Sequence, residues 1–284
     1  MEKVDVIINV YGKPWQTLCT LKSLKRFCNT HIDKIYLIEE KEQPYGDSID
    51  FIKNEIDNLI HYIPSAYEFF LPTRGDMSDV DIRYRYRYQY GIETSDKRHV
   101  FITHNDMLYN DDIIGNMLET IGDHAGIGLI GQCWNCPASM AAKCNGEGYL
   151  DYKPNYLEVM ELVETHKPAR GLYHNKFINI ENPMPLPECR LNEFACIINR
   201  DILINESYPN GDSPLFGAHD SLDTGTSWFR SVSEKGYLFK NYDINKDSVH
   251  GYFASAAGYP TQLDMEKYFA SEKNAKIYFN NNYL

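Results

Sequence analysis

The sequence predicts an α/β protein with a mixed, mainly parallel sheet that is flanked by helices. Three segments at the start of the chain support this prediction: a β-branched run at 4–10, apolar residues at helical spacing over 14–28, and a second apolar run at 35–38. A strand, a helix and a strand in this order form a β-α-β unit, in which the two strands run parallel. The carboxyl ends of such strands meet at one edge of the sheet.

The helix over 14–28 has a defined start and a defined apolar face. The segment YGKP at 11–14 predicts a turn, and Pro14 suits the first position of a helix. The apolar face consists of Trp15, Leu18, Leu21, Leu24 and Cys28. The strand that follows this helix ends in Glu39 and Glu40, so two carboxylates stand at its carboxyl end.

The alternation of strands and helices continues along the chain. We expect further strands at 59–63, 99–103, 126–131 and 194–198. We expect helices over about 79–94, after Asp111 and Asp112, and over 221–235, then a core-closing segment at 249–252 and a helical tail at 262–284 with a frayed polar end. Residues 133–190 are rich in Cys, Pro, Asn and Gly, and they predict an irregular insertion or a set of active-site loops around one helix near 155–165.

Length and charge exclude several classes of protein. The chain has 284 residues, enough to bury a sizeable core, and a net charge of −12. An acidic chain is unsuited to non-specific nucleic-acid binding, which depends on Lys and Arg contacts to phosphates. No apolar run approaches the roughly 20 residues that span a bilayer, and the start of the chain lacks a signal-peptide pattern. We therefore expect a cytoplasmic protein, and the odd number of cysteines, seven, fits reduced thiols.

Polar residues follow three of the predicted strands at the point where each strand ends. They are the segments 9–11, 39–40 and 104–106, the last of which reads His-Asn-Asp. In an open α/β sheet, ligands bind beyond the carboxyl ends of the strands. A carboxylate beside a His or Asn at such a position can hold Mg²⁺ or Mn²⁺, whose other ligands come from substrate phosphates. The alternative for 104–106 is a helix-capping turn without a ligand.

The order of these elements resembles the GT-A glycosyltransferases, and in particular their family 2-like branch. The motifs that carry the resemblance are VIINVYGKP, the acidic strand end near 40, FITHND, LNEFACIINRDIL, GAHDSLDTGTSWFRSVSEKGYLF and SVHGYF. Together they cover roughly residues 3–130 and 190–253. The resemblance implies a Rossmann-like GT-A fold that binds a nucleotide-diphosphate sugar.

The resemblance also implies roles for individual residues. The nucleotide would be bound by Asn9, Val10, Tyr11, Glu39, Arg87 and Asn105. The divalent metal would be bound by Asp106 and His250, with His104 as a further ligand where the family's motif begins with Asp. The general base would be Asp220, with Asp223 second; the family's Glu-Asp pair reads His219-Asp220 here. Among Arg83, Arg85 and Arg87, neighbours two residues apart cannot share one helix face, and Arg87 is our choice for the diphosphate.

The implied reaction is the metal-dependent transfer of a sugar, hexosyltransferase-like, from a nucleotide-sugar donor to a hydroxyl group of a glycan or other acceptor. The family branch favours inversion and a role in surface polysaccharide synthesis. We expect one domain, 1–284, with a nucleotide-sugar-binding half at 1–130, the insertion at 131–190, an acceptor and catalytic half at 191–260 and a tail at 261–284. Two alternatives stay open: a sugar-nucleotide nucleotidyltransferase, and a noncatalytic nucleotide- or glycan-binding protein in which His104 replaces a metal carboxylate.

The insertion contains a possible second metal site. Cys133 and Cys136 form a C-x-x-C pair, and Cys144 and Cys189 complete a set of four candidate ligands for a structural zinc ion. The second pair lacks C-x-x-C spacing, so unligated buried thiols are the alternative. Cys196 lies within an apolar strand and is expected to be part of the core.

Overall fold

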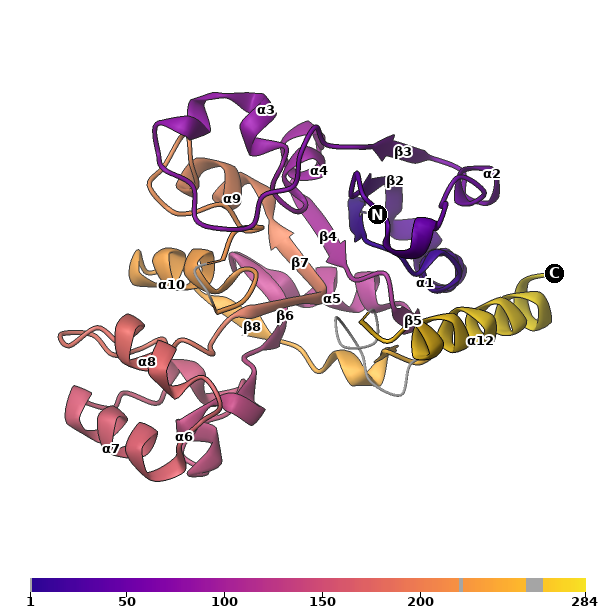
Figure 1. Cartoon of the computed structure of the whole chain (residues 1–284). Coiled ribbons are helices and arrows are strands. Elements are labelled where there is room, and N and C mark those ends of the chain that lie inside the picture. Colours follow the sequence, from indigo (N-terminus) through magenta and orange to yellow (C-terminus); the bar gives the residue numbers. More distant parts are fainter. Residues whose placement is uncertain (1, 220–221, 254–262) are drawn as a thin grey trace.

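The computed structural model describes residues 2–219, 222–253 and 263–284, and it confirms the predicted fold class. A seven-stranded sheet with the order β3-β2-β1-β4-β7-β6-β8 forms the centre of the molecule, and helices flank it (Figure 1). Its strands are β1 (Val4–Val10), β2 (Ile32–Glu39), β3 (Leu59–Tyr62), β4 (His99–Thr103), β6 (Gly126–Ile130), β7 (Leu191–Asn199) and β8 (Phe239–Asn241).

The sheet is mainly parallel, with one reversed strand. β1 pairs in parallel with β2 and with β4, β2 pairs in parallel with β3, and β6 pairs in parallel with β8. β7 runs antiparallel to both of its neighbours, β4 and β6. The carboxyl ends of β1, β2 and β4 therefore lie at the same edge of the sheet as the start of β7.

Each face of the sheet has its own apolar core because side chains alternate along a strand. Val6 and Ile8 belong to the core covered by α1 (Pro14–Cys28), α5 (Ile113–Ile121) and α12 (Met265–Tyr283). Ile7, between them, belongs to the opposite core, which includes side chains of α4 (Gln89–Thr94), α9 (Arg200–Glu206) and α10 (Thr226–Glu234). The long C-terminal helix α12 lies beside α1 (Figure 1).

The predicted helix over 79–94 is wrong in its middle. The structure has two short helices there, α3 (Val80–Arg83) and α4, separated by residues 84–88. Tyr88 adopts a left-handed conformation with φ 66°, which a continuous right-handed helix cannot include. The interruption takes Arg87 out of any helix and lets its side chain reach the cleft described below.

The segment predicted as an insertion contains more helix than expected. The predicted helix near 155–165 is present as α7 (Tyr156–His166), and α6 (Pro137–Met140) and α8 (Gly171–Phe177) were missed. In Figure 1 these three helices form a small group at the lower left, beside the β6 end of the sheet. The division of the chain at 130 and 190 stays a prediction.

Three expectations for the C-terminal third are corrected. The segment 249–252 does not close the core, because Val249 and Tyr252 are exposed; β9 (Ser248–His250) pairs with β5 (Met107–Tyr109) in a separate antiparallel pair. The helix predicted from 221 begins at Thr226, after a left-handed Gly225. The tail does not fray within its last residues, because α12 continues to Tyr283.

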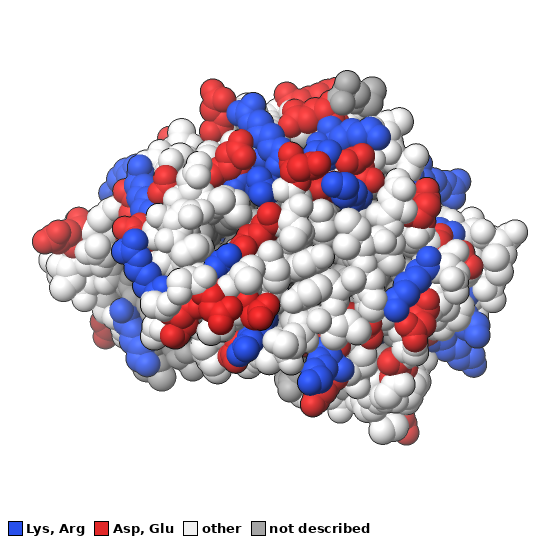
Figure 2. Space-filling view, turned by 90° about the horizontal axis from the view of Figure 1, so that it is seen from above, with Lys and Arg blue, Asp and Glu red and all other residues white. Residues whose placement is uncertain are grey.

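The remaining regular structure consists of short elements. These are α2 (Ile52–Glu55) and 3₁₀ turns at Asn29–His31, Pro44–Gly46, Asp76–Ser78, Cys133–Asn135, Gly148–Leu150 and Ile244–Lys246. Among the helices of the described segments, none is long and apolar enough to cross a membrane. On the face seen in Figure 2, Lys and Arg are interspersed with Asp and Glu and do not gather into one basic patch.

Candidate functional site

A cleft of about 860 Å³ opens at the edge of the sheet where β1, β2 and β4 end. Its walls come from these strand ends, from the loop before α3, from the interruption between α3 and α4, and from the segment before α10. The lining residues are Asn9, Tyr11, Lys13, Glu40, Lys41, Glu42, Ser65, Ala66, Tyr67, Phe69, Arg87, Tyr88, His104, Asn105, Asp106, His219, Leu222, Asp223 and Thr224. The position is the one at which open α/β sheets bind ligands.

The three residues assigned to the metal lie together beside this cleft. His104 and Asp106 follow β4 directly, and the pairing of β5 with β9 places His250 opposite Met107. The distance from Asp106 Oδ1 to His250 Nε2 is 3.2 Å, and to His104 Nδ1 it is 3.8 Å. Among the described residues, these three form the one group of three or more His, Cys, Asp or Glu side chains whose donor atoms all lie within 4.8 Å of one another.

The donor atoms of this group suit a divalent metal ion. Asp106 Oδ1 and His250 Nε2 are buried, and neither has a hydrogen-bond partner within the described parts of the chain. Buried polar atoms are nearly always satisfied, so an unsatisfied pair that faces one another calls for an explanation. A carboxylate oxygen and imidazole nitrogens are ligands that Mn²⁺ accepts, and three protein ligands leave positions for substrate oxygens.

A buried lysine that the sequence analysis did not select completes the surroundings of Asp106. Lys13 Nζ lies 2.7 Å from Asp106 Oδ2, and both side chains are almost fully buried. Burial alone would raise the pKa of Asp106, but the charges of Lys13 and the two histidines outweigh it and hold the pKa below its usual value. The signal that was available is the position of Lys13 in YGKP, directly after the first strand.

The conformation of Lys13 is unusual for a residue with a side chain. Its φ is 58°, in the left-handed region, and its backbone N–H donates a 2.7 Å hydrogen bond to the hydroxyl of Tyr268 on α12. Backbone strain of this kind is found preferentially at functional sites, where the surroundings hold it in place. Here α12 supplies that support from the far end of the sequence.

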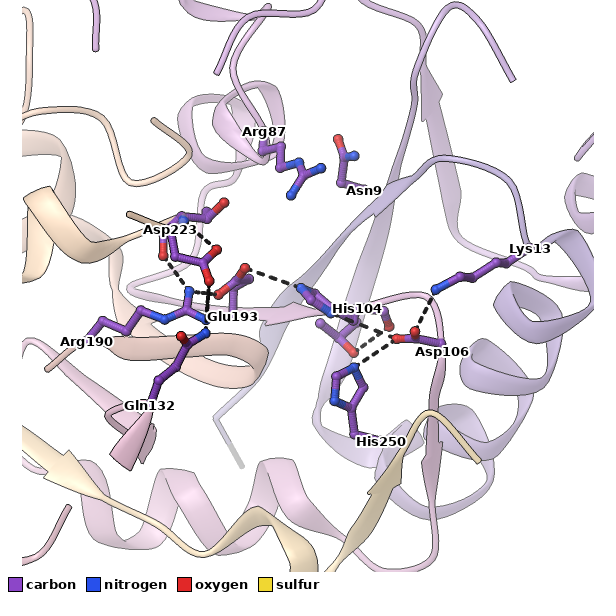
Figure 3. Close-up of polar contacts among 12 residues, drawn as sticks. Asn9, Lys13, Arg87, His104, Asp106, Gln132, Arg190, Glu193, Asp223 and His250 are labelled. Atoms are coloured by element: carbon purple, nitrogen blue, oxygen red, sulfur yellow. Dashed lines mark hydrogen bonds and ion pairs between the residues drawn. The ribbon is translucent and has the colours of Figure 1, made fainter. Parts of the chain in front are cut away.

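A chain of ion pairs leads from the metal-ligand group to the other side of the cleft (Figure 3). His104 Nε2 lies 3.4 Å from Glu193 Oε1, and Glu193 Oε2 lies 2.5 Å from Arg190 Nη1. Arg190 Nη2 lies 3.3 Å from Asp223 Oδ2. Burial opposes ionisation of Glu193, but Arg190 and His104 overcome it and lower its pKa to about 2. Glu193 lies on β7 and Arg190 directly before it, and they were not selected from the sequence because only the fold reveals the reversed placement of this strand.

Of the two carboxylates assigned as general base, Asp223 lines the cleft and Asp220 lies outside the described residues. Asp223 Oδ2 accepts a 2.8 Å hydrogen bond from Gln132 Nε2, and Oδ1 accepts one of 2.9 Å from the backbone N–H of Thr224. Arg170 Nη1 stands 3.8 Å from the same Oδ2. Asp223 is therefore a partly exposed carboxylate that hydrogen bonds hold in place and that lies near two arginines.

The residues assigned to the nucleotide divide into two groups. Asn9, Tyr11, Arg87 and Asn105 line the cleft. Arg87 donates to the hydroxyl of Tyr67 and stands 3.9 Å from Glu40 Oε1, which also accepts a 2.8 Å hydrogen bond from Asn9 Nδ2. Burial raises the pKa of Glu40, although Arg87, Asn9 and Tyr67 counteract this.

Two of these assignments, Glu39 and Val10, do not line the cleft, and Asn105 lines it while also making hydrogen bonds within the fold. Glu39 points away from the cleft and pairs with His61 on β3 at 2.7 Å, and Glu40 stands in the cleft in its place. The side chain of Val10 is buried in the core. Asn105 is nearly buried, and its Nδ2 donates to Gly12 O at 3.1 Å and to Thr17 Oγ1 at 3.2 Å, so it ties this turn to the start of α1.

Comparison with known proteins gives similar structures and no sequence relatives. No family model and no curated protein matches the sequence. Mouse xyloside xylosyltransferase 1 is 12% identical over 85% of this chain and 86% of its own, with a TM-score of 0.43. The mannosyltransferase PcManGT from Pyrobaculum calidifontis, solved with GDP-Man and Mn²⁺, is 9% identical over 99% of this chain and 75% of its own, with a TM-score of 0.45.

A third similar structure is the mannosyltransferase Ktr4p from S. cerevisiae. It is 12% identical over 74% of this chain and 58% of its own, with a TM-score of 0.37. All three proteins are glycosyltransferases, the class that the sequence motifs resemble. A shared reaction does not follow from likeness at these identities and scores, since one fold hosts many functions.

Proposed function

We propose that this chain is a metal-dependent glycosyltransferase, which moves a sugar from a nucleotide-diphosphate donor to an acceptor hydroxyl. One observation carries the proposal. His104, Asp106 and His250 gather at the carboxyl edge of the sheet, with unsatisfied buried donor atoms of Asp106 and His250 facing one another 3.2 Å apart. The adjoining cleft, at about 860 Å³, has the size of a cofactor or nucleotide site.

The cleft offers separate surroundings for the two parts of a donor. Asp106 and His250, with His104 beside them, would hold Mn²⁺ or Mg²⁺, which when bound neutralises charge on a diphosphate leaving group. Lys13 and Arg87 add two cationic side chains that line the same cleft. Asn9, Tyr11 and Glu40 offer hydrogen-bonding groups at the ends of β1 and β2, where the nucleoside would lie.

The acceptor hydroxyl must lose a proton as it attacks, and a carboxylate is suited to take it. We assign this role to Asp220, with Asp223 second. Direct displacement with such a base inverts the anomeric carbon, and we propose inversion together with a glycan acceptor of the surface-polysaccharide kind. Asp220→Asn and Asp223→Asn separate the two candidates, because loss of the base reduces kcat by roughly 10²–10⁴-fold.

The test of the proposal is a thermal-shift series with UDP, GDP, CDP, ADP and TDP, each with Mn²⁺ and with EDTA. A ligand that binds the folded state raises the melting temperature by mass action. We expect one diphosphate to stabilise the protein with Mn²⁺ only, and Asp106→Asn to abolish the effect. Asp123→Asn, on the exposed surface, is the matched control and should respond like the wild type. No stabilisation by any diphosphate, or an unchanged response of Asp106→Asn, contradicts the proposal.

One feature favours a second candidate function. His104 stands where a metal carboxylate is expected, so the chain presents one carboxylate where the family motif has two, a change that fits a binding protein without activity. Product analysis with the diphosphate identified above distinguishes the candidates. Release of nucleoside diphosphate indicates glycosyl transfer, and release of pyrophosphate indicates nucleotidyl transfer. Donor binding without turnover of any sugar nucleotide indicates the noncatalytic protein.

A further inference from the structure

Four cysteines from three separate segments surround one small cavity, away from the cleft. Cys133 and Cys136 lie at the two ends of the turn after β6, Cys144 follows α6, and Cys189 comes just before β7. All four line the same cavity, together with Gly131, Tyr149 and Glu188. The cavity holds about 10 Å³, which is room for one sphere of the size of a water molecule. All seven cysteines of the chain are free thiols.

We propose that Cys133, Cys136, Cys144 and Cys189 bind one structural zinc ion. Structural zinc sites are tetrahedral, and four cysteine thiolates with a C-x-x-C pair among them are a frequent ligand set. The space suits a single ion and is too small for an organic ligand. Each thiol gives up its proton on binding, so Zn²⁺ and four thiols yield a tetrathiolate complex and four protons, with no change of oxidation state.

The backbone around the cavity is shaped so that the cysteine-bearing segments approach one another. Gly131 joins β6 to Cys133 with φ 85°, a left-handed conformation in which a side chain would be strained. A Cβ at this position would lie 3.1 Å from Cys133 Sγ. A Cβ at Gly146, two residues after Cys144, would lie 2.7 Å from Ile130 O. Gly146 thus permits the close approach of the Cys144 segment to the end of β6, and Gly131 permits the turn that leads from β6 to Cys133.

The ion would join the small helical group to the central sheet. Cys136 directly precedes α6, which packs against α7, whereas Cys189 lies two residues before β7. Cys136 and Cys189 already belong to the same buried cluster, along with Tyr149 and Val159. Zinc would therefore link residues 133–144 to the segment that leads into the strand of Glu193. It would also hold in place Gln132 and Arg190, which contact Asp223 in the lining of the cleft.

Closure of the site requires small rotations of side chains. Among the described residues, no three of the cysteine sulfur atoms lie as close to one another as the donor atoms of the His104 group. Zinc–sulfur bonds are about 2.3 Å long, so the thiols must turn inward. Their present contacts are weak: Cys133 Sγ is 3.9 Å from Ile130 O, and Cys144 Sγ is 3.4 Å from Asn145 O. A change of χ1 rotamer moves each sulfur without moving the backbone.

The experiment measures metal bound to the full chain, purified without a metal-affinity tag from cells grown with added zinc. We expect about one zinc per chain by elemental analysis, since a site of this kind retains its ion through purification. Cys133→Ser and Cys144→Ser, both at partly exposed positions, should lose it. Cys28→Ala, a buried thiol elsewhere, should keep it, and so should Asp106→Asn, which removes a ligand of the cleft instead.

A second measurement covers the case in which the serine variants do not fold. The wild-type chain is stripped of metal and titrated with Co²⁺, whose thiolate complexes absorb strongly in the near ultraviolet. We expect saturation at one Co²⁺ per chain and displacement of the absorption by Zn²⁺. Three results overturn the proposal. Zinc stays in Cys133→Ser, or zinc is lost from Asp106→Asn but kept in the cysteine variants, or the wild-type chain takes up neither ion. A Cys133–Cys136 disulfide in protein prepared without oxidant also overturns it.

Discussion

The ammonium group of Lys13 lies 2.7 Å from Oδ2 of Asp106, with both side chains almost fully removed from solvent. The two oxygens of the Asp106 carboxylate therefore have different surroundings. One oxygen is neutralised by a cation that belongs to the chain, and the other faces His250 without a hydrogen bond. A buried charge must be paired, and this arrangement keeps Asp106 ionised whether or not a metal ion is bound.

Lys13→Met should destabilise the protein and make its stability depend on metal. Removal of one partner of a buried ion pair costs about 3–5 kcal/mol, because the remaining charge is left uncompensated. Asp106 then has only the two histidines beside it, and Mn²⁺ should restore more of the free energy of unfolding in the variant than it adds to the wild type. Urea unfolding with Mn²⁺ and with EDTA measures both effects.

The matched control is Lys25→Met on α1, the helix that Lys13 directly precedes. Lys25 pairs with Asp57, whose side chain is 77% exposed, and pairs of this kind contribute about 1 kcal/mol or less. We expect a small loss of stability that is the same with Mn²⁺ and with EDTA. An equal response of the two variants to Mn²⁺ would show that Lys13 is an ordinary structural lysine.

Gly217→Ala should weaken nucleotide binding through Arg87. A Cβ at Gly217 would lie 2.2 Å from Arg87 O and 2.9 Å from Arg87 N, and backbone atoms of this kind cannot be moved aside cheaply. The added methyl group must therefore displace the segment that places the side chain of Arg87 in the cleft. We expect a loss of roughly 1–3 kcal/mol of stability, typical of overpacking, and a weaker Mn²⁺-dependent response to the nucleoside diphosphate.

Gly75→Ala serves as the control for this substitution. Gly75 is exposed and has nothing within 4 Å of the added Cβ. Its effect on the melting temperature and on nucleotide binding should be close to zero. If Gly217→Ala binds the nucleotide as tightly as Gly75→Ala does, Arg87 is not part of the nucleotide site.

The parts of the fold that the sequence predicted are those with a local signal. β1 and β4 are apolar runs of strand length, and α1 has its apolar residues at helical spacing, so each is visible within a single window. His104 and Asp106 come just after the end of a strand. The predicted helix over 79–94 failed because the conformation of Tyr88 is set by its buried position and not by local propensity. Tertiary packing overrides weak propensity in this way.

The parts of the site that escaped prediction depend on strand order. Glu193 and Arg190 reach His104 and Asp223 because β7 lies antiparallel between β4 and β6, a placement with no signature in the residues themselves. His250 reaches Asp106 through the β5–β9 pair, and only its resemblance to a family motif singled it out. The sequence did not reveal which of Glu39 and Glu40 faces the cleft. Successive side chains of a strand point to opposite sides, so an error of one residue in the predicted end of the strand exchanges the two.

Arg190→Lys should be a damaging substitution despite conservation of charge. Arg190 is buried and bonds three acceptors at once: Glu193 Oε2 at 2.5 Å, Thr224 O at 2.7 Å and Asp223 Oδ2 at 3.3 Å. A lysine presents one compact ammonium group and cannot span them. We expect a loss of about 2 kcal/mol in the free energy of unfolding, since buried acceptors are left unsatisfied.

Arg98→Lys provides the comparison for Arg190→Lys. Arg98 is 56% exposed and has a fully exposed partner, Asp123, so the change should stay within about 0.5 kcal/mol. Both variants are measured by urea unfolding at neutral pH. Equal stability of the two variants would mean that the ion-pair chain between His104 and Asp223 does not stabilise the cleft.

Glu272→Gln should remove a pH dependence from the stability of the protein. Glu272 on α12 is buried, and this raises its pKa to about 7 although the backbone N–H of Trp15 donates to it at 2.7 Å. The folded protein thus holds this proton more tightly than the unfolded chain, whose Glu pKa is about 4.3. The stabilising contribution is complete below about pH 4 and is lost as the pH rises towards 7.

The wild type should therefore lose stability relative to Glu272→Gln as the pH rises from about 4 to about 7, by on the order of 3 kcal/mol. Taking the difference between the two proteins at each pH cancels the titration of all other groups. Glu266→Gln, at an exposed position on the same helix, should show no such slope. If the difference in the free energy of unfolding between the two proteins does not change with pH, Glu272 is ionised in the folded protein throughout this range. The contact between α12 and the start of α1 is then independent of pH.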